Sequence, residues 1–339
     1  MPLDIEHPES LLEYLRLHGH ISGDERPEFR VLTGGVSNRT VWVRRPNGQS
    51  WVLKQALEKL RVEADWFSNP ERIHREAAGL RWLIQLVPIG TIPELVFEDT
   101  DAHLLAMQAV PEPHDNWKTQ LLKGKVNFDY IRQFGQLLAM IQRGAYEKRE
   151  QIAREFEDRS FFESLRIEPY YLYTATSCVE AADFLTDLVQ ETRNAIITLT
   201  HGDYSPKNVL VYQDRLVLLD HEVIHFGDPA FDLGFSMTHL LSKAHHLKSL
   251  RLTFADATKQ YWQSYTDVLG NLPWTPGLEA RAVRHTLACL LARVAGKSPL
   301  EYLSLEERLT QQKCVLMLMN EGPVSVPDLV DRFIGGLPQ

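Results

Sequence analysis

The sequence predicts an α+β fold, with an antiparallel sheet near the N-terminus followed by a mainly helical region. Two observations support this prediction. Over residues 29–110, short apolar runs with strand-like alternation are separated by turn residues, which is typical of antiparallel strands. Beyond Pro113, apolar residues recur at helical spacing, most strongly over 128–141. We therefore expect two domains, 1–111 and 112–339.

Composition and charge place the chain among ordinary globular proteins. Of its 339 residues, 44% are apolar and 24% are charged, and the net charge is −9 without any run of Lys or Arg, so nucleic acid is not an expected partner. The start of the chain, MPLDIEHPES, lacks a signal pattern, and no apolar run approaches membrane-spanning length. Cys178, Cys289 and Cys314 are odd in number and lack C-x-x-C spacing, which indicates neither disulfides nor zinc. We expect a cytoplasmic enzyme with no membrane partner.

The first third of the chain is expected to build the sheet. A helix with an apolar face precedes it, and turn residues such as those at 46–48 separate the strands. The elements expected in this part are a helix at 10–17, strands at 29–32, 41–43 and 51–54, a helix at 70–83, and strands at 94–97 and 104–110.

Lys54 and Glu76 are expected to form an ion pair. Lys54 ends an apolar strand, and a solvent-facing lysine on an edge strand is the alternative. Glu76 shares one helix face with Leu80, so it points inward, and an inward glutamate is costly unless it is paired. Glu71, at the more exposed start of the same helix, is the competing partner.

The rest of the chain is expected to be helical, except around residues 200–220. The segment 145–194 is charged, aromatic-rich and helix-like. Further helices are expected at 235–250, 252–269, 278–295 and 305–320, before a tail that contains Pro and Gly.

A polar motif begins at His201. His201, Asp203 and Asn208 fit H-x-D-x-x-x-x-N, the spacing of a kinase catalytic loop. Two short apolar strands flank a turn at Asp214, and a hairpin folded about that residue sets Asn208 opposite Asp220. Two hard oxygen ligands would then meet near Asp203, an arrangement that suits Mg²⁺.

This arrangement predicts a nucleotide-dependent phosphotransferase. Asp203 is the expected catalytic base, which accepts the proton of the acceptor hydroxyl, and Asn208 and Asp220 are the expected magnesium ligands. Glu222 shares a strand face with Asp220 and is expected at a second metal or a metal-bound water. His201 is expected to orient the loop by a hydrogen bond to neighbouring backbone.

Three motifs carry a family resemblance. HGDYSPKN, then Asp220-His221-Glu222, then GDPAFDLG at 227–234 resemble the aminoglycoside phosphotransferase/choline kinase superfamily, which includes methylthioribose, homoserine and fructosamine kinases. The resemblance implies a bilobal, protein-kinase-like fold and transfer of the ATP γ-phosphoryl group to a small-molecule hydroxyl. Residues 1–111 would form the nucleotide-binding lobe, and 112–339 would hold the catalytic loop and the acceptor site. Too few residues separate Glu222 from Gly227 for the activation loop of a protein kinase.

The resemblance also implies how ATP and Mg²⁺ are held. Lys54 would bind phosphates while Glu76 steadies it, and the glycine-containing connection before the second strand would cover them, although an ordinary hairpin loop is the alternative. A hinge would read adenine with backbone groups near Met107, which would bound the pocket; an ordinary buried strand is equally compatible. The expected nucleotide-contacting residues are Gly34, Gly35, Ser37, Asn38, Lys54, Glu76, Gln108 and Val110.

Other expectations concern supporting residues and alternatives. Asp228 fits a helix N-cap before Pro229, and Asp232 is expected to anchor the catalytic-loop backbone, as the matching residue does in the family. The segment 145–194, with Tyr170, Tyr171 and Tyr173, is a candidate wall of the acceptor pocket, although aromatic stripes usually belong to a core. An ATP-binding pseudokinase and a Mg²⁺-dependent phosphohydrolase are the alternative functions. The acceptor, the preference for ATP over GTP and the oligomeric state stay open.

Overall fold

The computed structural model describes residues 3–33, 35–61 and 67–338. The chain divides into two compact units: Met1–His114 with Leu219–Glu222, and Asp115–Leu218 with Val223–Gln339. The short segment Leu219–Glu222, far along the sequence, thus belongs to the N-terminal unit. In the described part of the chain, no helix combines the length and the apolar character that crossing a membrane requires.

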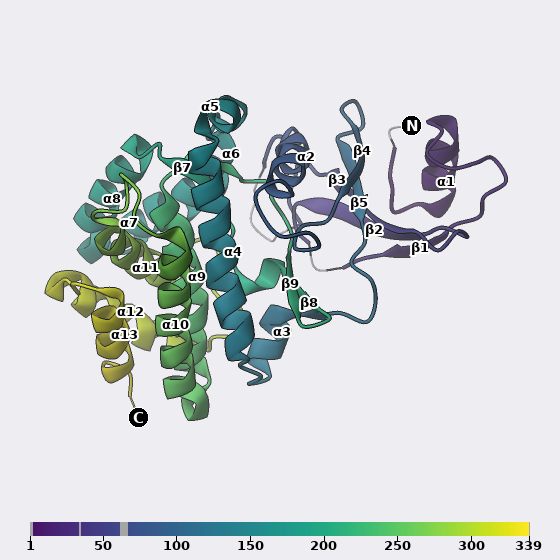
Figure 1. Ribbon diagram of the computed structural model, residues 1–339. Coiled ribbons are helices and arrows are strands. Elements are labelled where there is room, and N and C mark those ends of the chain that lie inside the picture. Colours follow the sequence, from purple (N-terminus) through teal and green to yellow (C-terminus); the bar gives the residue numbers. More distant parts are fainter. Residues whose placement is uncertain (1–2, 34, 62–66, 339) are drawn as a thin grey trace. The chain divides into compact units, whose positions relative to one another are not determined.

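The first unit is built on an antiparallel sheet with strand order β1-β2-β3-β5-β4 (Figure 1). A tight turn at 45–49 connects the second and third of these strands, where the N–H of Arg45 donates to the carbonyl of Gln49 around Gly48, whose φ is +88°. The elements of this unit are α1 (Pro8–Leu17), β1 (Glu28–Val31), β2 (Asn38–Arg44), β3 (Ser50–Ala56), α2 (Arg72–Leu83), β4 (Leu95–Asp99) and β5 (Leu104–Gln108). These elements lie where the apolar patterns predict them.

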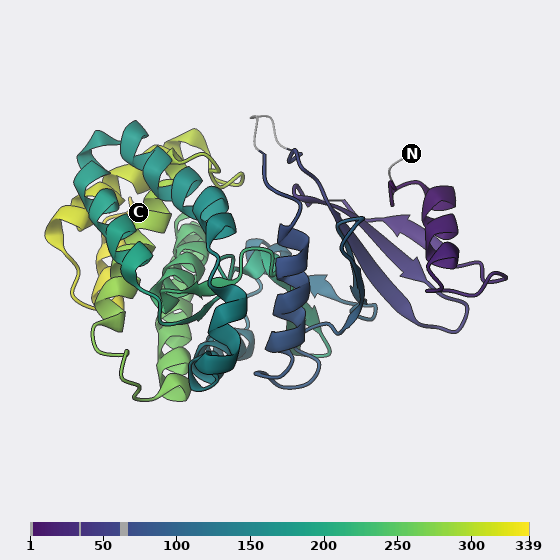
Figure 2. The ribbon, with the colours of Figure 1, turned by 90° about the horizontal axis from the view of Figure 1, so that it is seen from above.

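The helices α1 and α2 lie on opposite faces of this sheet (Figure 2). Leu53 of β3 belongs to the apolar cluster that includes Leu11 and Leu15 of α1. Successive side chains of a strand point to opposite faces, so Lys54 points to the α2 side. One face of β3 is therefore ordinary core, whereas the other face carries the lysine.

The second unit is mainly helical. The long helix α4 (Phe128–Glu147) packs along α10 (Arg251–Leu269), and α9 (Pro229–His246) packs against both α10 and α11 (Leu278–Ala295). A π-helical stretch, Glu163–Leu172, interrupts the segment before the catalytic loop. The other helices are α3 (Trp117–Leu122), α5 (Arg149–Ile152), α6 (Ser160–Phe162), α7 (Tyr173–Ser177), α8 (Ala182–Asn194), α12 (Leu305–Glu321) and α13 (Val326–Gly335).

Short strands complete this unit. Strand β8 pairs with β6 and β9 in one small sheet, and β7 pairs with β10 in another. Their bounds are β6 (Asp115–Asn116), β7 (Thr198–Thr200), β8 (Val209–Tyr212), β9 (Arg215–Leu218) and β10 (His225–Gly227). The two small sheets frame the loops that carry the expected catalytic residues.

One helix start confirms a capping prediction, and one helix lies beyond the expected elements. Helix α9 begins at Pro229, as the expected N-cap at Asp228 requires, although apolar spacing alone indicated a start near residue 235; the Asp228 carboxylate accepts from the N–H of Ala230 at 3.0 Å. The tail expected after residue 320 contains α13, which Ser325 caps by accepting from the N–H of Asp328. Pro327 lies in the first turn of this helix, where a missing N–H costs nothing.

Gly234 marks the contact between α9 and α11. A Cβ at this position would lie 2.5 Å from the Cβ of His285 and 2.6 Å from its carbonyl carbon. We therefore expect Gly234→Ala to lower the free energy of unfolding by ~1–3 kcal/mol, the usual cost of overpacking. Urea denaturation measures this change.

Gly335→Ala is the matched control, since a Cβ there would meet no atom within 4 Å. We expect that variant to unfold at the same urea concentration as the wild type or slightly above it, because alanine favours a helix. Equal destabilisation by the two substitutions would show that the α9–α11 contact is not the constraint.

Candidate active site

The first unit brings three charged side chains together around Lys54. Its Nζ lies 2.7 Å from Oε1 of Glu76 and 3.0 Å from Oδ1 of Asp220. Lys54 is 8% exposed and Glu76 is fully buried. Burial by itself would lower the pKa of Lys54, but the Asp220 and Glu76 carboxylates more than offset it, so the pKa is raised and the ammonium stays charged.

Glu76, rather than Glu71, is the partner of Lys54 on α2. Burial raises the pKa of Glu76, and the ion pair with Lys54 opposes that shift. Its second oxygen, Oε2, is buried without a hydrogen-bond partner among the described residues. Glu71 stands at the N-cap of α2, and its carboxylate lies 3.5 Å from Nδ1 of His103 instead.

Asp220 reaches Lys54 through an unusual backbone conformation. Its φ is +68°, in the left-handed region that non-glycine residues seldom occupy. Aspartate tolerates that region better than most residues do, and such conformations concentrate at functional sites. Asp220 follows β9 after a single residue, so the chain leaves the hairpin and turns at once toward the lysine.

Glu222 is engaged with a buried arginine. Its Oε2 accepts from Nε of Arg72 at 3.2 Å and from Nδ2 of Asn38 at 3.4 Å. Arg72 is fully buried in the first turn of α2 and also donates to the carbonyls of Ser37 and Leu57. Arg72 could not be recognised from the sequence, because nothing in the pattern distinguishes it from a solvated residue at a helix start. A metal-binding role for Glu222 would thus have to coexist with this ion pair.

The expected phosphate cover is only partly a loop. Gly34 lies outside the described residues. Asn38 is the first residue of β2, paired with Ala56 of β3, and its side chain is buried. Ser37 is also buried, and its carbonyl accepts from the N–H of Leu57 at 3.0 Å. Hydrogen bonds to β3 and α2 therefore hold the end of the connection.

The expected hinge begins inside the sheet. The N–H of Gln108 donates to the carbonyl of Glu94 at 2.8 Å, so an adenine contact at Gln108 would use its carbonyl oxygen. Met107 is buried in β5, and Val110 lies beyond the end of that strand.

The second unit holds Asp203 between two donors. Nδ2 of Asn208 donates to Oδ2 of Asp203 at 2.6 Å and to its carbonyl oxygen at 3.0 Å. Nη2 of Arg166 lies 3.0 Å from the other carboxylate oxygen, Oδ1. These contacts fix the orientation of the carboxylate. They use the amide nitrogen of Asn208, whereas a metal ion would need its amide oxygen.

Asp232 holds the backbone on which Asp203 stands. Its fully buried carboxylate accepts from the N–H of His201 at 2.7 Å and from that of Gly202 at 2.8 Å. Burial raises the pKa of Asp232 to about 7, and the two backbone N–H groups oppose that shift. Gly202 has a φ of +76°, and a Cβ there would lie 2.9 Å from the carbonyl oxygen of Val223, so the turn requires glycine.

His201 has a part in the same loop. Its Nδ1 accepts from the N–H of Asp203 at 3.2 Å, and the ring is fully buried. This hydrogen bond to the backbone of Asp203 is the kind of contact expected of His201.

The hairpin after the loop has a different register from the expected one. Its turn consists of Gln213 and Asp214, whose φ angles are +47° and +58°, as a type I′ turn requires. The ladder pairs Val209 with Leu218, so its centre lies between the two turn residues. The prediction that a hairpin centred on Asp214 pairs Asn208 with Asp220 was therefore wrong. The prediction took Asp214 itself as the centre of the hairpin. The observed turn has two residues, Gln213 and Asp214, so the centre lies between them and every pairing shifts.

Arg166 is a second residue that the sequence did not reveal. It lies in the π-helical stretch, and its Nε also donates to the carbonyl of Gly202 at 2.7 Å. One arginine in a segment of mixed charge carries no signal, because its partners lie more than 35 residues further along the chain. The geometry makes it a positioning residue for Asp203.

The aromatic residues of the same segment divide between core and surface. Tyr171 is fully buried, with its hydroxyl 2.7 Å from Nδ1 of His285, so it belongs to the core. Tyr170 is buried and accepts a hydrogen bond from Arg293, whereas Tyr173 is exposed. For Tyr171 the structure favours the stated alternative, a place in the core, because its side chain faces α11 inside the second unit.

The donors present suit a magnesium nucleotide. Asp220 in the first unit and Asn208 in the second carry oxygen atoms of the hard type that Mg²⁺ prefers, and Lys54 carries a positive charge of the kind that a phosphate requires. The partnerless Oε2 of Glu76 is the kind of buried polar atom that an ordered water or a ligand satisfies.

The chain belongs to the phosphotransferase enzyme family, because the model of this family matches residues 28–268. Methylthioribose kinase from Citrobacter koseri is 26% identical over 242 residues, which are 64% of this chain and 60% of that protein. The chain thus spans about three fifths of the length of this curated relative.

Solved structures of small-molecule kinases share the fold. Ethanolamine kinase from Plasmodium vivax has a TM-score of 0.58 at 12% identity, covering 93% of this chain and 90% of that one. Amicoumacin kinase in complex with AMP-PNP and Ca²⁺ has a TM-score of 0.57 at 13% identity, covering 88% and 89%. Choline kinase from Streptococcus pneumoniae has a TM-score of 0.51 at 13% identity, covering 92% and 98%. At these identities the likeness establishes the fold, which is protein-kinase-like.

The Lys54–Glu76 pair predicts coupled effects on stability. We expect Lys54→Met to destabilise the protein more than Glu76→Gln does, because Asp220 still neutralises Lys54 in the second variant. The two effects should be non-additive by ~0.5–3 kcal/mol, the usual range for groups in one network. Chemical denaturation of the single and double variants measures this coupling.

The exposed pair Lys259–Asp331, with a distance of 2.6 Å, is the matched control. Its double-mutant cycle, with Lys259→Met and Asp331→Asn, should give at most ~1 kcal/mol. Additive effects at Lys54 and Glu76 would mean that the two side chains do not act as a unit.

Proposed function

We propose that this chain is an ATP- and Mg²⁺-dependent phosphotransferase that moves the γ-phosphoryl group to an alcohol of a small molecule. The observation that carries the proposal is the pairing of Lys54 with both Glu76 and Asp220. A lysine on the third strand, paired with a glutamate of the next helix, is the phosphate-binding arrangement of protein-kinase-like enzymes. Lys54 and Glu76 are buried and Asp220 is partly buried, and burying charged groups is expensive for stability alone, which favours a functional reason for the cluster.

The first unit supplies the groups that hold the nucleotide. Lys54 would bind phosphate oxygens, and its ion pair with Glu76 would keep the ammonium in place if Asp220 held a metal ion. Asn208, Asp220 and Glu222 are the proposed metal ligands. The ion supplies positive charge that offsets the charge of the phosphates. Gly34, Gly35, Ser37 and Asn38 are proposed to cover the phosphates, and Gln108 and Val110 to contact adenine.

Asp203 is the proposed catalytic base. It takes the proton of the acceptor hydroxyl while the new oxygen–phosphorus bond forms and the bond between the γ-phosphorus and the bridging oxygen breaks, which releases ADP. Arg166 and Asn208 hold the carboxylate in one orientation through the contacts at 3.0 and 2.6 Å. Asp232 holds the loop backbone beneath it. Proton transfer therefore begins from a preorganised carboxylate.

The acceptor is proposed to be a sugar, an amino sugar or an amino alcohol. A methylthio-substituted ribose is the first candidate, since the relative from Citrobacter koseri is a methylthioribose kinase and Asp220-x-Glu222 resembles that subgroup. Asn208 departs from the pattern expected of that subgroup, so the screen must be wider. Such a reaction suits the cytoplasm, where ATP is available.

A metabolite screen tests this function. Purified protein, Mg-ATP and a library of sugars, amino sugars and amino alcohols are incubated together, and mass spectrometry detects one added phosphate. We expect one class of small alcohols to be phosphorylated. Nucleotide binding with no turnover on any acceptor would favour the pseudokinase alternative. Acceptor-independent release of phosphate would favour a phosphohydrolase.

Asp203→Asn is expected to lower kcat by ~10²–10⁴-fold, the usual contribution of a general base. Affinity for Mg-ATP should stay nearly unchanged, because the substitution removes a proton acceptor and no phosphate contact. The measurement is steady-state kinetics together with calorimetry. The control is Asp187→Asn at an exposed position of α8, which should behave as the wild type. Activity of Asp203→Asn within a few-fold of wild type would remove Asp203 from the mechanism.

Asp220→Ala is expected to abolish the Mg²⁺ dependence of nucleotide binding, since it removes a charged ligand. Calorimetry with ATP in the presence and absence of Mg²⁺ measures this. Asp101→Ala, an exposed aspartate of the same unit, is the control and should leave binding intact. An unchanged metal dependence in Asp220→Ala would mean that this carboxylate only pairs with Lys54.

A further inference from the structure

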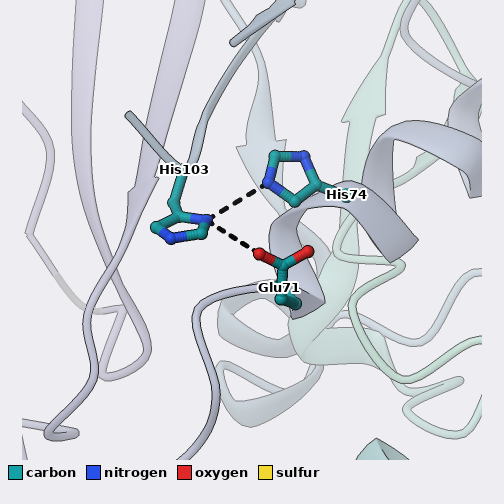
Figure 3. A group of neighbouring side chains, drawn as sticks. All are labelled: Glu71, His74 and His103. Carbon is teal, nitrogen blue, oxygen red and sulfur yellow. Dashed lines mark hydrogen bonds and ion pairs between the residues drawn. The ribbon is translucent and has the colours of Figure 1, made fainter. Parts of the chain in front are cut away.

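A second group of possible metal ligands lies in the first unit, apart from the residues assigned above. Glu71 and His74 extend from the start of α2, and His103 stands in the turn just before β5. Figure 3 shows the three side chains directed toward one another. Nε2 of His74 lies 3.2 Å from Nδ1 of His103, and Oε1 of Glu71 lies 3.5 Å from the same nitrogen.

These separations are those of ligands around one small cation. Two ligand atoms at about 2.0–2.1 Å from a tetrahedral zinc ion lie about 3.3 Å from each other. All three candidate ligand atoms lie within 4.8 Å of one another. The Glu71 side chain is 57% exposed, so it can adjust to an ion without disturbing the core.

A fourth residue orients the cluster. Nδ1 of His74 lies 2.6 Å from Oε1 of Glu98, on β4. A carboxylate that accepts a hydrogen bond from one ring nitrogen places the proton there and leaves the lone pair of the other nitrogen for a metal. Glu98 is itself held by Arg81 of α2. The lone pair of Nε2 of His74 is therefore directed toward His103, as a metal ligand requires.

We propose that Glu71, His74 and His103 bind one zinc-class divalent ion, with water completing a tetrahedron. Two imidazoles and one carboxylate favour Zn²⁺ over Mg²⁺, which prefers oxygen ligands. The site joins the first turn of α2 to the turn before β5. His103 is anchored on its own side, because its carbonyl accepts from the N–H of Ala56 at the end of β3. The ion thus braces the helix that carries Glu76 against the sheet that carries Lys54.

Metal binding by the full-length protein, without a histidine tag and after treatment with a chelator, tests this site. Isothermal calorimetry with Zn²⁺ should give one equivalent. Cobalt(II) should give the visible absorption of a tetrahedral complex. Zinc should also raise the melting temperature and slow amide exchange in α2. An excess of Mg²⁺ should not displace the zinc.

Four variants locate the site. His74→Gln and His103→Gln should each abolish the stoichiometric binding, and Glu98→Gln should weaken it by ~10–100-fold, as loss of a carboxylate that orients a ligand histidine does. Glu71→Gln should weaken binding as well. It changes an exposed side chain, so it keeps the test valid if a histidine variant fails to fold. His7→Gln, at a histidine that is 77% exposed, is the matched control and should bind zinc as the wild type does.

Two results would overturn the proposal. One is zinc binding that is equally strong in the wild type and in Glu71→Gln and His103→Gln, which would indicate adventitious binding elsewhere. The other is no stoichiometric binding by the wild type, which would leave the two histidines as a plain hydrogen-bonded pair. Neither result bears on phosphotransfer, since none of these residues has a part in the proposed reaction.

Discussion

The ion pair of Lys54 with Glu76 and Asp220 joins three segments of the first unit that lie far apart in the sequence. A buried ammonium is costly unless carboxylates surround it. Strand β3, helix α2 and the segment after β9 must therefore keep their relative positions. The same requirement explains why Leu219–Glu222 belongs to the N-terminal unit. The left-handed backbone of Asp220 is the local cost of bringing its carboxylate to the lysine.

In the second unit, hydrogen bonds to buried polar groups fix the relative positions of segments that lie far apart in the sequence. Its proposed catalytic loop, 201–208, carries a glycine at positive φ, and a buried Asp232 satisfies two of the loop's backbone N–H groups. Buried polar groups need partners, so the loop and the start of α9 are held as one piece. One carboxylate oxygen of Asp203 then accepts a hydrogen bond from Asn208, and the other forms an ion pair with Arg166. This preorganisation makes a carboxylate an effective base in the proposed reaction.

The fold was largely predictable because its signals are local. Strand alternation and helical spacing placed most elements within a few residues, and the grouping of Asp203, Asn208 and Asp220 from motif spacing stays a prediction. The Asp228 cap was predicted from the sequence, whereas α13 was missed because a proline in the first turn of a helix resembles a loop when the sequence is read alone. The hairpin register was wrong because it depends on which two residues take positive φ.

By itself the sequence determined the fold class, the order of its elements and the residue types required for phosphotransfer, because periodicity and motif spacing are properties of short segments. Only the tertiary structure decided which charged groups meet. Arg72 against Glu222, Arg166 against Asp203, and His74 against His103 join residues between 29 and 150 positions apart, and no local pattern encodes such pairs. The packing of strands and helices decides which residues become partners, because a buried charge or ring nitrogen needs a hydrogen-bond partner.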